Sequence, residues 1–363
     1  MPPPLLRRNS TMTTPPTAST TMHRAVAEPL SGVRLETADV PTPAAGQVLV
    51  QSVLVGICGS DIHAIAGHHP FLASTYLPGH EATGVVAALG EGVEGVEVGQ
   101  RVLLKPNVAC GTCLNCRAGR SNACERLSWI GCDPSGHWAG AMAEYFVAPA
   151  GNLYAVPDSV DDETAALVEC LATPVHAARI AGDLAGARVV VLGAGTIGVL
   201  CVVAALNAGA GTVVATDLDE GKLARATRIG AHGAVKASDA DANEQVAAAL
   251  GGPADVVLDC VANERSYAQA VSLLRRAGTL VVVGVPARDA VLPMPIIQDF
   301  EIRVQGCAAY TEADVETAIS IAVDGGLPTA EVVSGRYALE DISEAFAAAN
   351  ADSTGKLLVS PRS

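Results

Sequence analysis

The sequence has few basic residues and few aromatic ones. The first shortage argues against a class of partner, and the second limits the composition of the core. Only 23 of the 363 residues are Lys or Arg, against 38 Asp or Glu, and the formal net charge is −15. A protein that follows nucleic-acid phosphates needs a basic surface, so we expect no nucleic-acid partner. Aromatic residues make up 3% of the chain, so the core must consist mainly of Ala, Val, Leu and Ile.

The chain also lacks an obvious membrane span and an export signal. Residues 189–216 carry no charge, but glycines and Asn207 interrupt them, whereas a spanning helix needs about 20 predominantly apolar residues. Residues 1–21 are rich in Pro, Thr and Ser and contain no apolar run long enough for a signal peptide. We therefore predict a disordered extension at 1–21, no contact with membranes and a cytoplasmic location. In such a reducing compartment, patterned cysteines indicate metal binding more often than disulfides.

The character of the chain changes along its length. Between about residues 23 and 153, short apolar runs alternate with Gly and Pro, which is typical of a region rich in β-strands. Between about 181 and 306, Val- and Leu-rich strands alternate with helices, which predicts an α/β domain with a doubly wound parallel sheet. The expected strands are 188–192, 212–216, 256–260 and 279–285, and the expected helices are 197–207, 220–229 and 266–274. The rest returns to helix, loop and a last strand at 356–359.

A glycine-rich turn follows the first of these strands. Gly193, Gly195 and Gly198 form G-x-G-x-x-G between a strand and a helix, where backbone N–H groups and the helix N-terminus bind a pyrophosphate. We expect Thr196 and Ile197 to border the same site.

An acid ends the next strand. Asp217 lies 24 residues after Gly193, and a carboxylate there binds the ribose hydroxyls and repels a 2′-phosphate, which predicts NAD rather than NADP. The alternative is a glycine turn in a nucleotide-free sheet, with Asp217 as a simple cap. Asp219 and Glu220 lie close by and compete for the same role.

Four cysteines follow the pattern C-x2-C-x2-C-x7-C, namely Cys110, Cys113, Cys116 and Cys124. Four thiolates can surround one tetrahedral Zn²⁺ and leave no open position. The spacing therefore predicts a structural zinc in a lobe at about 106–126. An iron–sulfur cluster also takes four cysteines and is the alternative.

Three other segments offer a mixed set of donors. Cys58 lies in Gly-Ile-Cys-Gly-Ser-Asp-Ile-His, His80 in Pro-Gly-His-Glu, and Glu169 just before Cys170. Three protein ligands with an open position are typical of a catalytic zinc. With these motifs, the four cysteines and Gly-Ala-Gly-Thr-Ile-Gly, the sequence resembles the zinc-dependent medium-chain alcohol and polyol dehydrogenases from about Met22 to its end.

The resemblance implies a GroES-like, β-rich catalytic domain at 22–180, a Rossmann domain at 181–312 and a return to the catalytic domain at 313–363. It also implies a hydride transfer from a secondary alcohol, such as a small polyol or a sugar-derived alcohol, to NAD. Each subunit would hold one catalytic and one structural zinc, in a homotetramer or homodimer. A simpler secondary or primary alcohol is the alternative substrate. The intact donors argue against a zinc-free reductase and against a non-enzymatic relative.

The resemblance also assigns ligands to the catalytic zinc. Cys58 and His80 match the first two ligands, Glu169 the third, and Glu81 an acid that can move onto the metal. Cys170 competes with Glu169 on donor chemistry alone. In a helix, neighbouring residues point about 100° apart, and Glu169 shares a face with Thr173 at i+4. We therefore expect Glu169 to face the metal and Cys170 to point into packing.

The remaining roles concern the proton and the nicotinamide. Ser60 matches the hydroxyl that relays the substrate proton, and His63 matches the end of that relay. Asp61 matches the carboxylate that orients the zinc histidine. Thr173 matches a residue beside the nicotinamide ring.

Two positions depart from the sorbitol-type members of the family. Cys170 replaces the proline after the third ligand, and Ala309 replaces the arginine before Tyr310 that helps bind polyol hydroxyls. The substrate could therefore equally be a secondary alcohol with fewer hydroxyls or a different polyol. Other residues near the motifs line the cleft or pack, and they are His68, His69, Phe71, Trp129 and Trp138. Without ligand spacing, small core residues are expected at Cys132, Cys201, Cys260 and Cys307.

Overall fold

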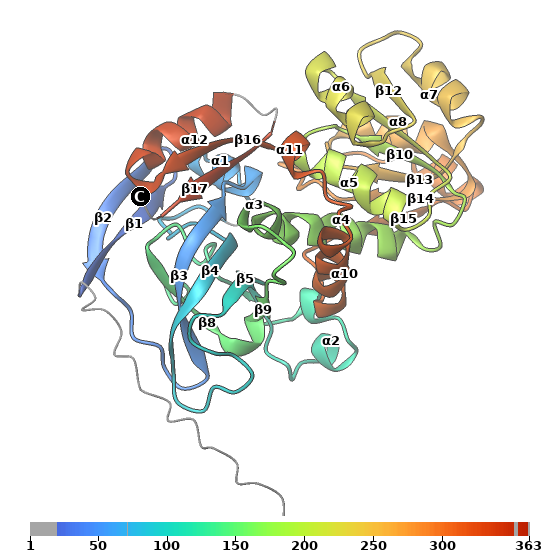
Figure 1. Ribbon diagram of the computed structural model, residues 1–363. Helices are drawn as coiled ribbons and strands as arrows, with labels where there is room; N and C mark the ends of the chain where they lie inside the picture. The colour runs from blue at the N-terminus through green and yellow to red at the C-terminus, as the bar shows by residue number, and fades with distance from the viewer. Residues whose placement is uncertain (1–19, 71, 352–354, 362–363) are drawn as a thin grey trace, which may run out of the picture.

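The computed structural model describes residues 20–70, 72–351 and 355–361, which form two parts lying side by side (Figure 1). Most of the predicted extension at 1–21 lies outside the described residues, and Thr21 already begins the first strand, β1 (Thr21–Glu28). β1 forms an antiparallel hairpin with β2 (Gly32–Asp39). Helix α12 (Ile342–Ala351), from the far end of the chain, contacts β2.

The first part is built on a seven-stranded sheet. Its strands are β3 (Gln47–Gly56), β4 (Glu81–Leu89), β5 (Arg101–Leu104), β8 (Tyr145–Pro149), β9 (Leu153–Ala155), β16 (Val333–Ala338) and β17 (Lys356–Ser360). β3 is central because it pairs antiparallel with β4, β8 and β17. The buried side chains Val48, Val50 and Phe146 build one apolar core from these strands. The last strand thus joins the same sheet as the early ones.

Short elements surround this sheet. They are α1 (Gly59–Ile65), α3 (Asp162–Ala166), α11 (Thr329–Val332) and the 3₁₀ turns Ser121–Ala123, Ala150–Asn152 and Leu339–Asp341. The cysteine lobe contains α2 (Leu114–Arg117) and follows β6 (Asn107–Val108), which pairs antiparallel with β7 (Ser128–Trp129). Helix α10 (Glu312–Val323) packs on α4 (Val168–Ala181) and lies near the lobe (Figure 1).

The second part is a six-stranded parallel sheet in the order β12-β11-β10-β13-β14-β15. Its strands are β10 (Arg188–Leu192), β11 (Thr212–Asp217), β12 (Gly233–Lys236), β13 (Ala254–Asp259), β14 (Leu274–Val282) and β15 (Arg303–Gly306). The helices are α5 (Thr196–Asn207), α6 (Glu220–Ile229), α7 (Ala242–Leu250), α8 (Glu264–Leu273) and α9 (Met294–Asp299). This strand order is that of a Rossmann domain, so the predicted doubly wound sheet is confirmed.

Local sequence explains the two elements that matter most for the site. The run of valines in β10 is buried on both faces of the sheet, as a central parallel strand requires. Helix α6 begins where the Asp219 side chain accepts a hydrogen bond from the Lys222 backbone N–H at 2.8 Å, and it ends at the left-handed Gly230. The end of β11 and the start of α6 therefore hold Asp217 at the carboxyl edge of the sheet.

Some of the helices and strands differ from the predicted ones. β12, α7, α9 and β15 were not predicted, and three of them are short, since β12 and β15 have four residues each and α9 has six. β14 begins at Leu274 and ends at Val282, earlier than the expected 279–285, because Leu274 pairs with Ala254 across a register shift. The uncharged stretch 189–216 forms β10, α5 and β11, and no helix within the described ranges could cross a membrane.

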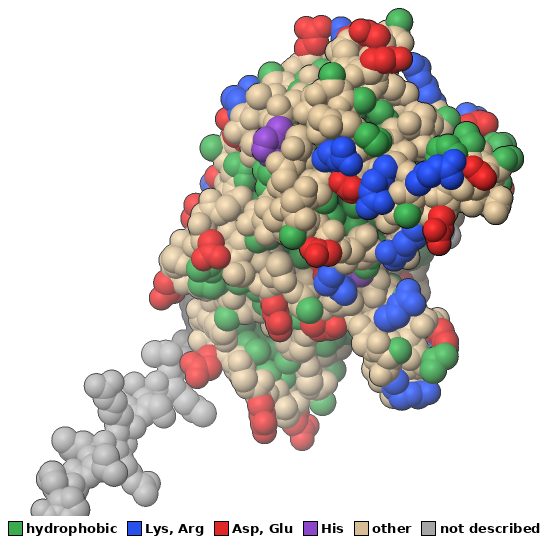
Figure 2. All heavy atoms as spheres, turned by 90° about the vertical axis from the view of Figure 1, so that its right-hand side faces the viewer, with side chains coloured by type: hydrophobic (Ala, Val, Ile, Leu, Met, Phe, Trp, Pro, Cys, Tyr) green, Lys and Arg blue, Asp and Glu red, His purple; other side chains and the backbone are tan. Residues whose placement is uncertain are grey.

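Charge is unevenly spread over the molecule. Figure 2 shows Lys and Arg side chains gathered across the middle of one face, although the whole chain is acidic. Several basic residues of the Rossmann domain pair with acids, since Arg188 and Arg275 both bind Asp255, and Arg276 binds Asp299.

Candidate active site

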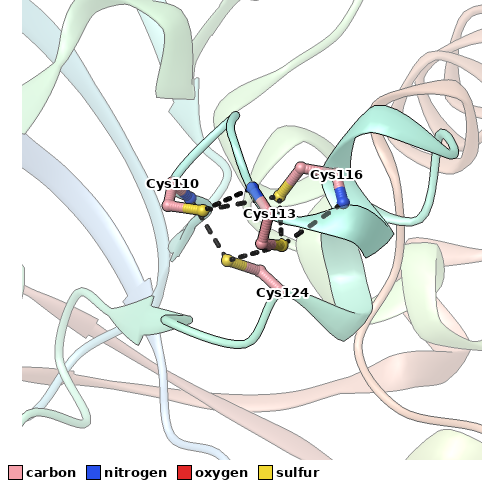
Figure 3. A group of neighbouring side chains, drawn as sticks. All are labelled: Cys110, Cys113, Cys116 and Cys124. Carbon is pink, nitrogen blue, oxygen red and sulfur yellow. Dashed lines mark hydrogen bonds between the residues drawn. The ribbon is translucent and has the colours of Figure 1, made fainter.

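The cysteine lobe gathers its four thiols at one point (Figure 3). Its donor atoms all lie within 4.8 Å of one another. The sulfur of Cys113 is 3.4 Å from that of Cys116 and 3.9 Å from that of Cys124. A tetrahedral zinc with bonds of about 2.3 Å needs sulfurs about 3.8 Å apart. The four sulfurs thus lie close to the spacing that one zinc ion requires.

The protein backbone around the lobe favours thiolates. The backbone N–H groups of Cys113, Cys116 and Arg126 each donate to a cysteine sulfur, at 3.3–3.4 Å. The Arg126 side chain, followed by backbone donors, lowers the pKa of Cys110 to about 5. Thiolates are the form that binds metal.

The lobe is tied to the rest of the chain at the start of α10. Glu312 binds Lys105 at 3.0 Å and accepts a hydrogen bond from Ser121 at 2.7 Å. The Asn107 amide donates to the carbonyl of Tyr310 at 2.9 Å. The lobe is therefore held against the segment at 310–312, which also contacts the second group of donors described next.

The second group lies where β3 and β4 meet. Cys58 precedes α1, and His80 and Glu81 stand at the start of β4. The antiparallel register pairs Gly56 with Glu81, which brings the two segments together. The donor atoms of Cys58, His80 and Glu81 lie within 4.8 Å of one another. One sulfur, one nitrogen and one carboxylate oxygen therefore meet in a largely buried place and could hold a zinc ion.

A buried lysine neutralises this group. The Lys356 ammonium, on β17, lies 2.7 Å from both carboxylate oxygens of Glu81. Burial would raise the pKa of Glu81, but Lys356 and His80 outweigh it and hold that pKa below its ordinary value. Sequence reasoning did not single out Lys356. The available signal was a lysine at the head of the apolar strand Lys-Leu-Leu-Val, because a lysine is rarely fully buried without a partner.

Glu169 and Cys170 both reach the site from the first turn of α4. Their donor atoms form a group with Glu81 within 4.8 Å. Cys170 belongs to the apolar core, as expected, but its thiol also donates to Glu81 at 3.2 Å. The prediction that Cys170 packs is therefore confirmed, and its thiol makes an additional contact with Glu81 that was not predicted, because the first turn of α4 starts beside the cluster.

A tyrosine holds the other side of Glu169. The Tyr310 hydroxyl donates to Glu169, and both side chains are buried. Burial, reinforced by the charge of Glu81, raises the pKa of Glu169 to about 7 although His80 opposes it. The Trp129 ring lies edge-on between the rings of His80 and Tyr310, with centroids 6.4 and 6.3 Å away. Trp129 thus lines the site, whereas Trp138 lies in the core.

His80 has two acidic neighbours. The carboxylate of Asp61 lies 3.9 Å from His80 Nδ1, and the sulfur of Cys132 lies 3.2 Å from the same nitrogen. Burial raises the pKa of Asp61. Cys132 was expected to be a plain core residue, and this is wrong. Its position after a turn carries no ligand spacing, so only the fold shows the contact.

The proposed proton and nicotinamide residues lie beside these donors. Ser60 is half-buried and His63 is exposed, and both belong to α1 at positions three apart, on one helix face. Thr173 is half-buried on α4, one turn after Glu169, and its carbonyl is 3.9 Å from the Cys307 thiol. His69 accepts a hydrogen bond from the Leu72 backbone, and Phe71 lies outside the described residues.

The glycine-rich turn lies at the carboxyl edge of the Rossmann sheet. A side chain at Gly198 would approach the carbonyl of Gly193 to 1.7 Å, so only glycine lets α5 pack this close to β10. Asp217 accepts hydrogen bonds from the Ala194 backbone at 2.8 Å and from the Asp219 backbone at 3.0 Å. The turn, the N-terminus of α5 and Asp217 thus meet in one place, which fits the diphosphate and ribose of a dinucleotide.

Comparisons with known proteins agree with this geometry. Residues 44–158 match the family model of the alcohol dehydrogenase GroES-like domain, and residues 196–324 match that of the zinc-binding dehydrogenase. Sorbitol dehydrogenase of Bacillus subtilis is 31% identical over 331 residues, with 90% of this chain and 92% of the relative covered.

Two solved structures share the whole fold. An Escherichia coli alcohol dehydrogenase complexed with NADH superposes with a TM-score of 0.87 at 27% identity, over 94% of this chain and 100% of that one. A putative zinc-binding dehydrogenase from Sinorhizobium meliloti bound to NADP gives a TM-score of 0.87 at 30% identity, with the same coverage.

The fold and the two donor groups define an oxidoreductase that binds zinc and a nicotinamide dinucleotide. The chain belongs to the zinc-dependent medium-chain alcohol and polyol dehydrogenases. The predictions of the family, the fold class, an enzyme that acts on alcohols, and zinc and NAD as cofactors are thereby confirmed.

Proposed function

We propose that this enzyme oxidises a secondary alcohol, a small polyol or a sugar-derived alcohol, with NAD as the hydride acceptor. The observation that carries the proposal is the meeting of Cys58, His80 and Glu81 in one buried group. Zinc bound there would act as a Lewis acid and lower the pKa of the alcohol.

The residues of the chain divide the remaining tasks. Cys58 and His80 hold the metal, and Glu81 supplies the third donor of the compact group. Glu169 faces the site from α4 and would bind the metal directly or through a water when the metal is present. Ser60 takes the substrate proton, and His63 passes it to solvent because its side chain is exposed. Thr173 borders the nicotinamide.

The dinucleotide site is proposed to favour NAD. Gly193, Gly195, Thr196, Ile197 and Gly198 border the diphosphate. Asp217 binds the ribose hydroxyls, and its charge repels a 2′-phosphate. We place the Rossmann domain at 181–312, between catalytic segments at 22–180 and 313–363, in line with the pairing of β17 with β3.

The substrate is proposed to be a secondary alcohol with fewer hydroxyls than sorbitol-type substrates, or a polyol that is bound in a different way. Ala309 is half-buried next to Tyr310 and has no polar group to offer a polyol. A panel of secondary alcohols, polyols and ketones, followed by NADH absorbance, tests the proposal. We expect turnover with at least one secondary alcohol and NAD. Failure with the whole panel by an enzyme that carries two zinc ions per chain would contradict it.

Oligomerisation is proposed to use the free edge of the Rossmann sheet, in a cytoplasmic homodimer or homotetramer. β15 is the last strand of that sheet. The exposed residues Val291, Met294, Ile296 and Val304 lie on or just before it. A second copy would cover these apolar side chains and pair the edge. Light scattering should give a mass of two or four chains, and a monomer at micromolar concentration would refute this.

A further inference from the structure

The histidine proposed as a zinc ligand is held by more than its metal. His80 is 4% exposed, so each of its ring nitrogens needs a partner in the protein or a metal. Its Nδ1 lies 3.2 Å from the sulfur of Cys132 and 3.9 Å from the nearest oxygen of Asp61. The sulfur is within hydrogen-bonding distance, whereas 3.9 Å is too long for a direct hydrogen bond to an oxygen.

Asp61 is engaged elsewhere. Its Oδ1 accepts a hydrogen bond from the Tyr76 hydroxyl at 2.8 Å, and its Oδ2 accepts one from the Cys58 backbone at 3.4 Å. The carboxylate therefore fixes the start of α1 and the loop that carries Tyr76. The sulfur of Cys132, and not Asp61, is therefore the nearer partner for His80 Nδ1.

The backbone holds Cys132 against His80. The Cys132 N–H donates to the Trp129 carbonyl at 3.2 Å. The preceding residue, Gly131, has a φ of +81°, and a side chain there would meet the Gly79 carbonyl at 2.4 Å. The turn at 131–132 thus packs against the backbone of Gly79 and His80. The main chain therefore holds Cys132 beside the His80 ring.

We propose that Cys132 is a positioning residue for His80, an inference that rests on the proposed role of His80 as a zinc ligand. Its sulfur accepts the Nδ1–H hydrogen bond. This contact fixes the tautomer and the ring plane and keeps the Nε2 lone pair available to the metal. Partners of this kind orient metal-bound histidines, and their loss costs about 10–100-fold in metal affinity or activity.

The test compares Cys132→Ala with Cys132→Ser, which retains an acceptor, and with Cys201→Ala, which removes a buried thiol within α5. The rate of zinc transfer to a chelating dye would be measured for each protein, with the four-cysteine zinc as an internal reference. Cys132→Ala should release the catalytic zinc about 10–100-fold faster than the wild type. Cys132→Ser should fall between them, and Cys201→Ala should match the wild type.

Cobalt substitution at the catalytic site distinguishes a positioning residue from a ligand. Cys132→Ala should shift the visible d–d bands, because the imidazole changes orientation, and it should retain the sulfur-to-cobalt charge-transfer band of Cys58. Loss of half of that band would make Cys132 a ligand and overturn the proposal.

The outcomes separate this inference from the proposed function. Zinc release and cobalt spectra within twofold of the wild type in Cys132→Ala would overturn the role of Cys132 alone. If that variant does not fold, Cys132→Val decides, because it fills the space without accepting a hydrogen bond, and wild-type zinc release with an unshifted spectrum from it would overturn the role. A wild-type enzyme that binds only the lobe zinc would overturn both proposals.

Discussion

The two metal centres are built in opposite ways. The lobe takes four sulfurs from one short segment, Cys110 to Cys124, and its donors are held by local turns. The catalytic group takes three kinds of donor from α1, β4 and α4, and its counter-ion comes from β17. A local site can form with its own loop, whereas a dispersed site exists only once the sheet has its register. The first should therefore govern stability, and the second should govern chemistry.

The largest expected effect separates the two centres directly. Cys113→Ser should remove the lobe zinc and with it a metal contribution that reaches about 10–16 kcal/mol in isolated zinc peptides. We expect aggregation, or a large fall in the unfolding midpoint measured by calorimetry. Cys58→Ser should leave the midpoint nearly unchanged and abolish turnover. If the two variants showed the same loss of stability, the contrast between the centres would be wrong.

The next effect concerns the ion pair inside the catalytic group. Lys356→Met leaves the buried Glu81 carboxylate without its cation, which should cost about 3–5 kcal/mol of unfolding free energy. Urea unfolding measures this cost. The double variant Lys356→Met with Glu81→Gln is the matched control, because it removes both charges and should regain much of the loss. A single variant within about 1 kcal/mol of the wild type would show that water reaches the pair.

The third effect tests which neighbour on α4 acts at the metal. Glu169→Ala should lower kcat/KM by about 10²-fold or more, equivalent to at least about 2.7 kcal/mol of transition-state stabilisation. Cys170→Ala should be mild, because Cys170 packs in the apolar core and its thiol donates only to Glu81. Steady-state kinetics with NAD provide the measurement, and the reverse ranking would make Cys170, not Glu169, the residue of α4 that acts at the metal.

The smallest effect lies in the Rossmann domain, away from both metals. Asp217→Ala should raise kcat/KM with NADP relative to NAD by about 10–100-fold, because one repelling charge contributes roughly 1.4–2.7 kcal/mol. Glu220→Ala, on the exposed side of α6, should leave the ratio unchanged. A wild type that already uses both dinucleotides equally well would refute the role of Asp217.

The sequence predicted best what a single segment determines. The spacing of Cys110 to Cys124 and the strand, glycine turn and acid that end at Asp217 carry their geometry within one supersecondary unit. Cys132 and Lys356 were missed, because their partners lie 52 and 275 residues away. A lysine at the head of an apolar strand indicates a buried partner, but its segment does not identify that partner. The packing of Cys170 was predicted from helical periodicity, but its contact with Glu81 was not, because the first turn of α4 lies close enough to Glu81 for both Glu169 and Cys170 to reach it.

The position of Lys356 near the end of the chain also affects the order in which the two domains can fold during synthesis. Glu81 emerges from the ribosome 275 residues before the lysine that neutralises it, and the whole Rossmann domain is made in between. At a synthesis rate of roughly 5–20 residues per second, Lys356 is made about 15–55 s after Glu81. During that time β3 lacks β17, and the nascent catalytic domain has an unpaired edge and an uncompensated acid. The Rossmann domain can therefore complete its own sheet first, and the catalytic site closes as one of the last events in folding.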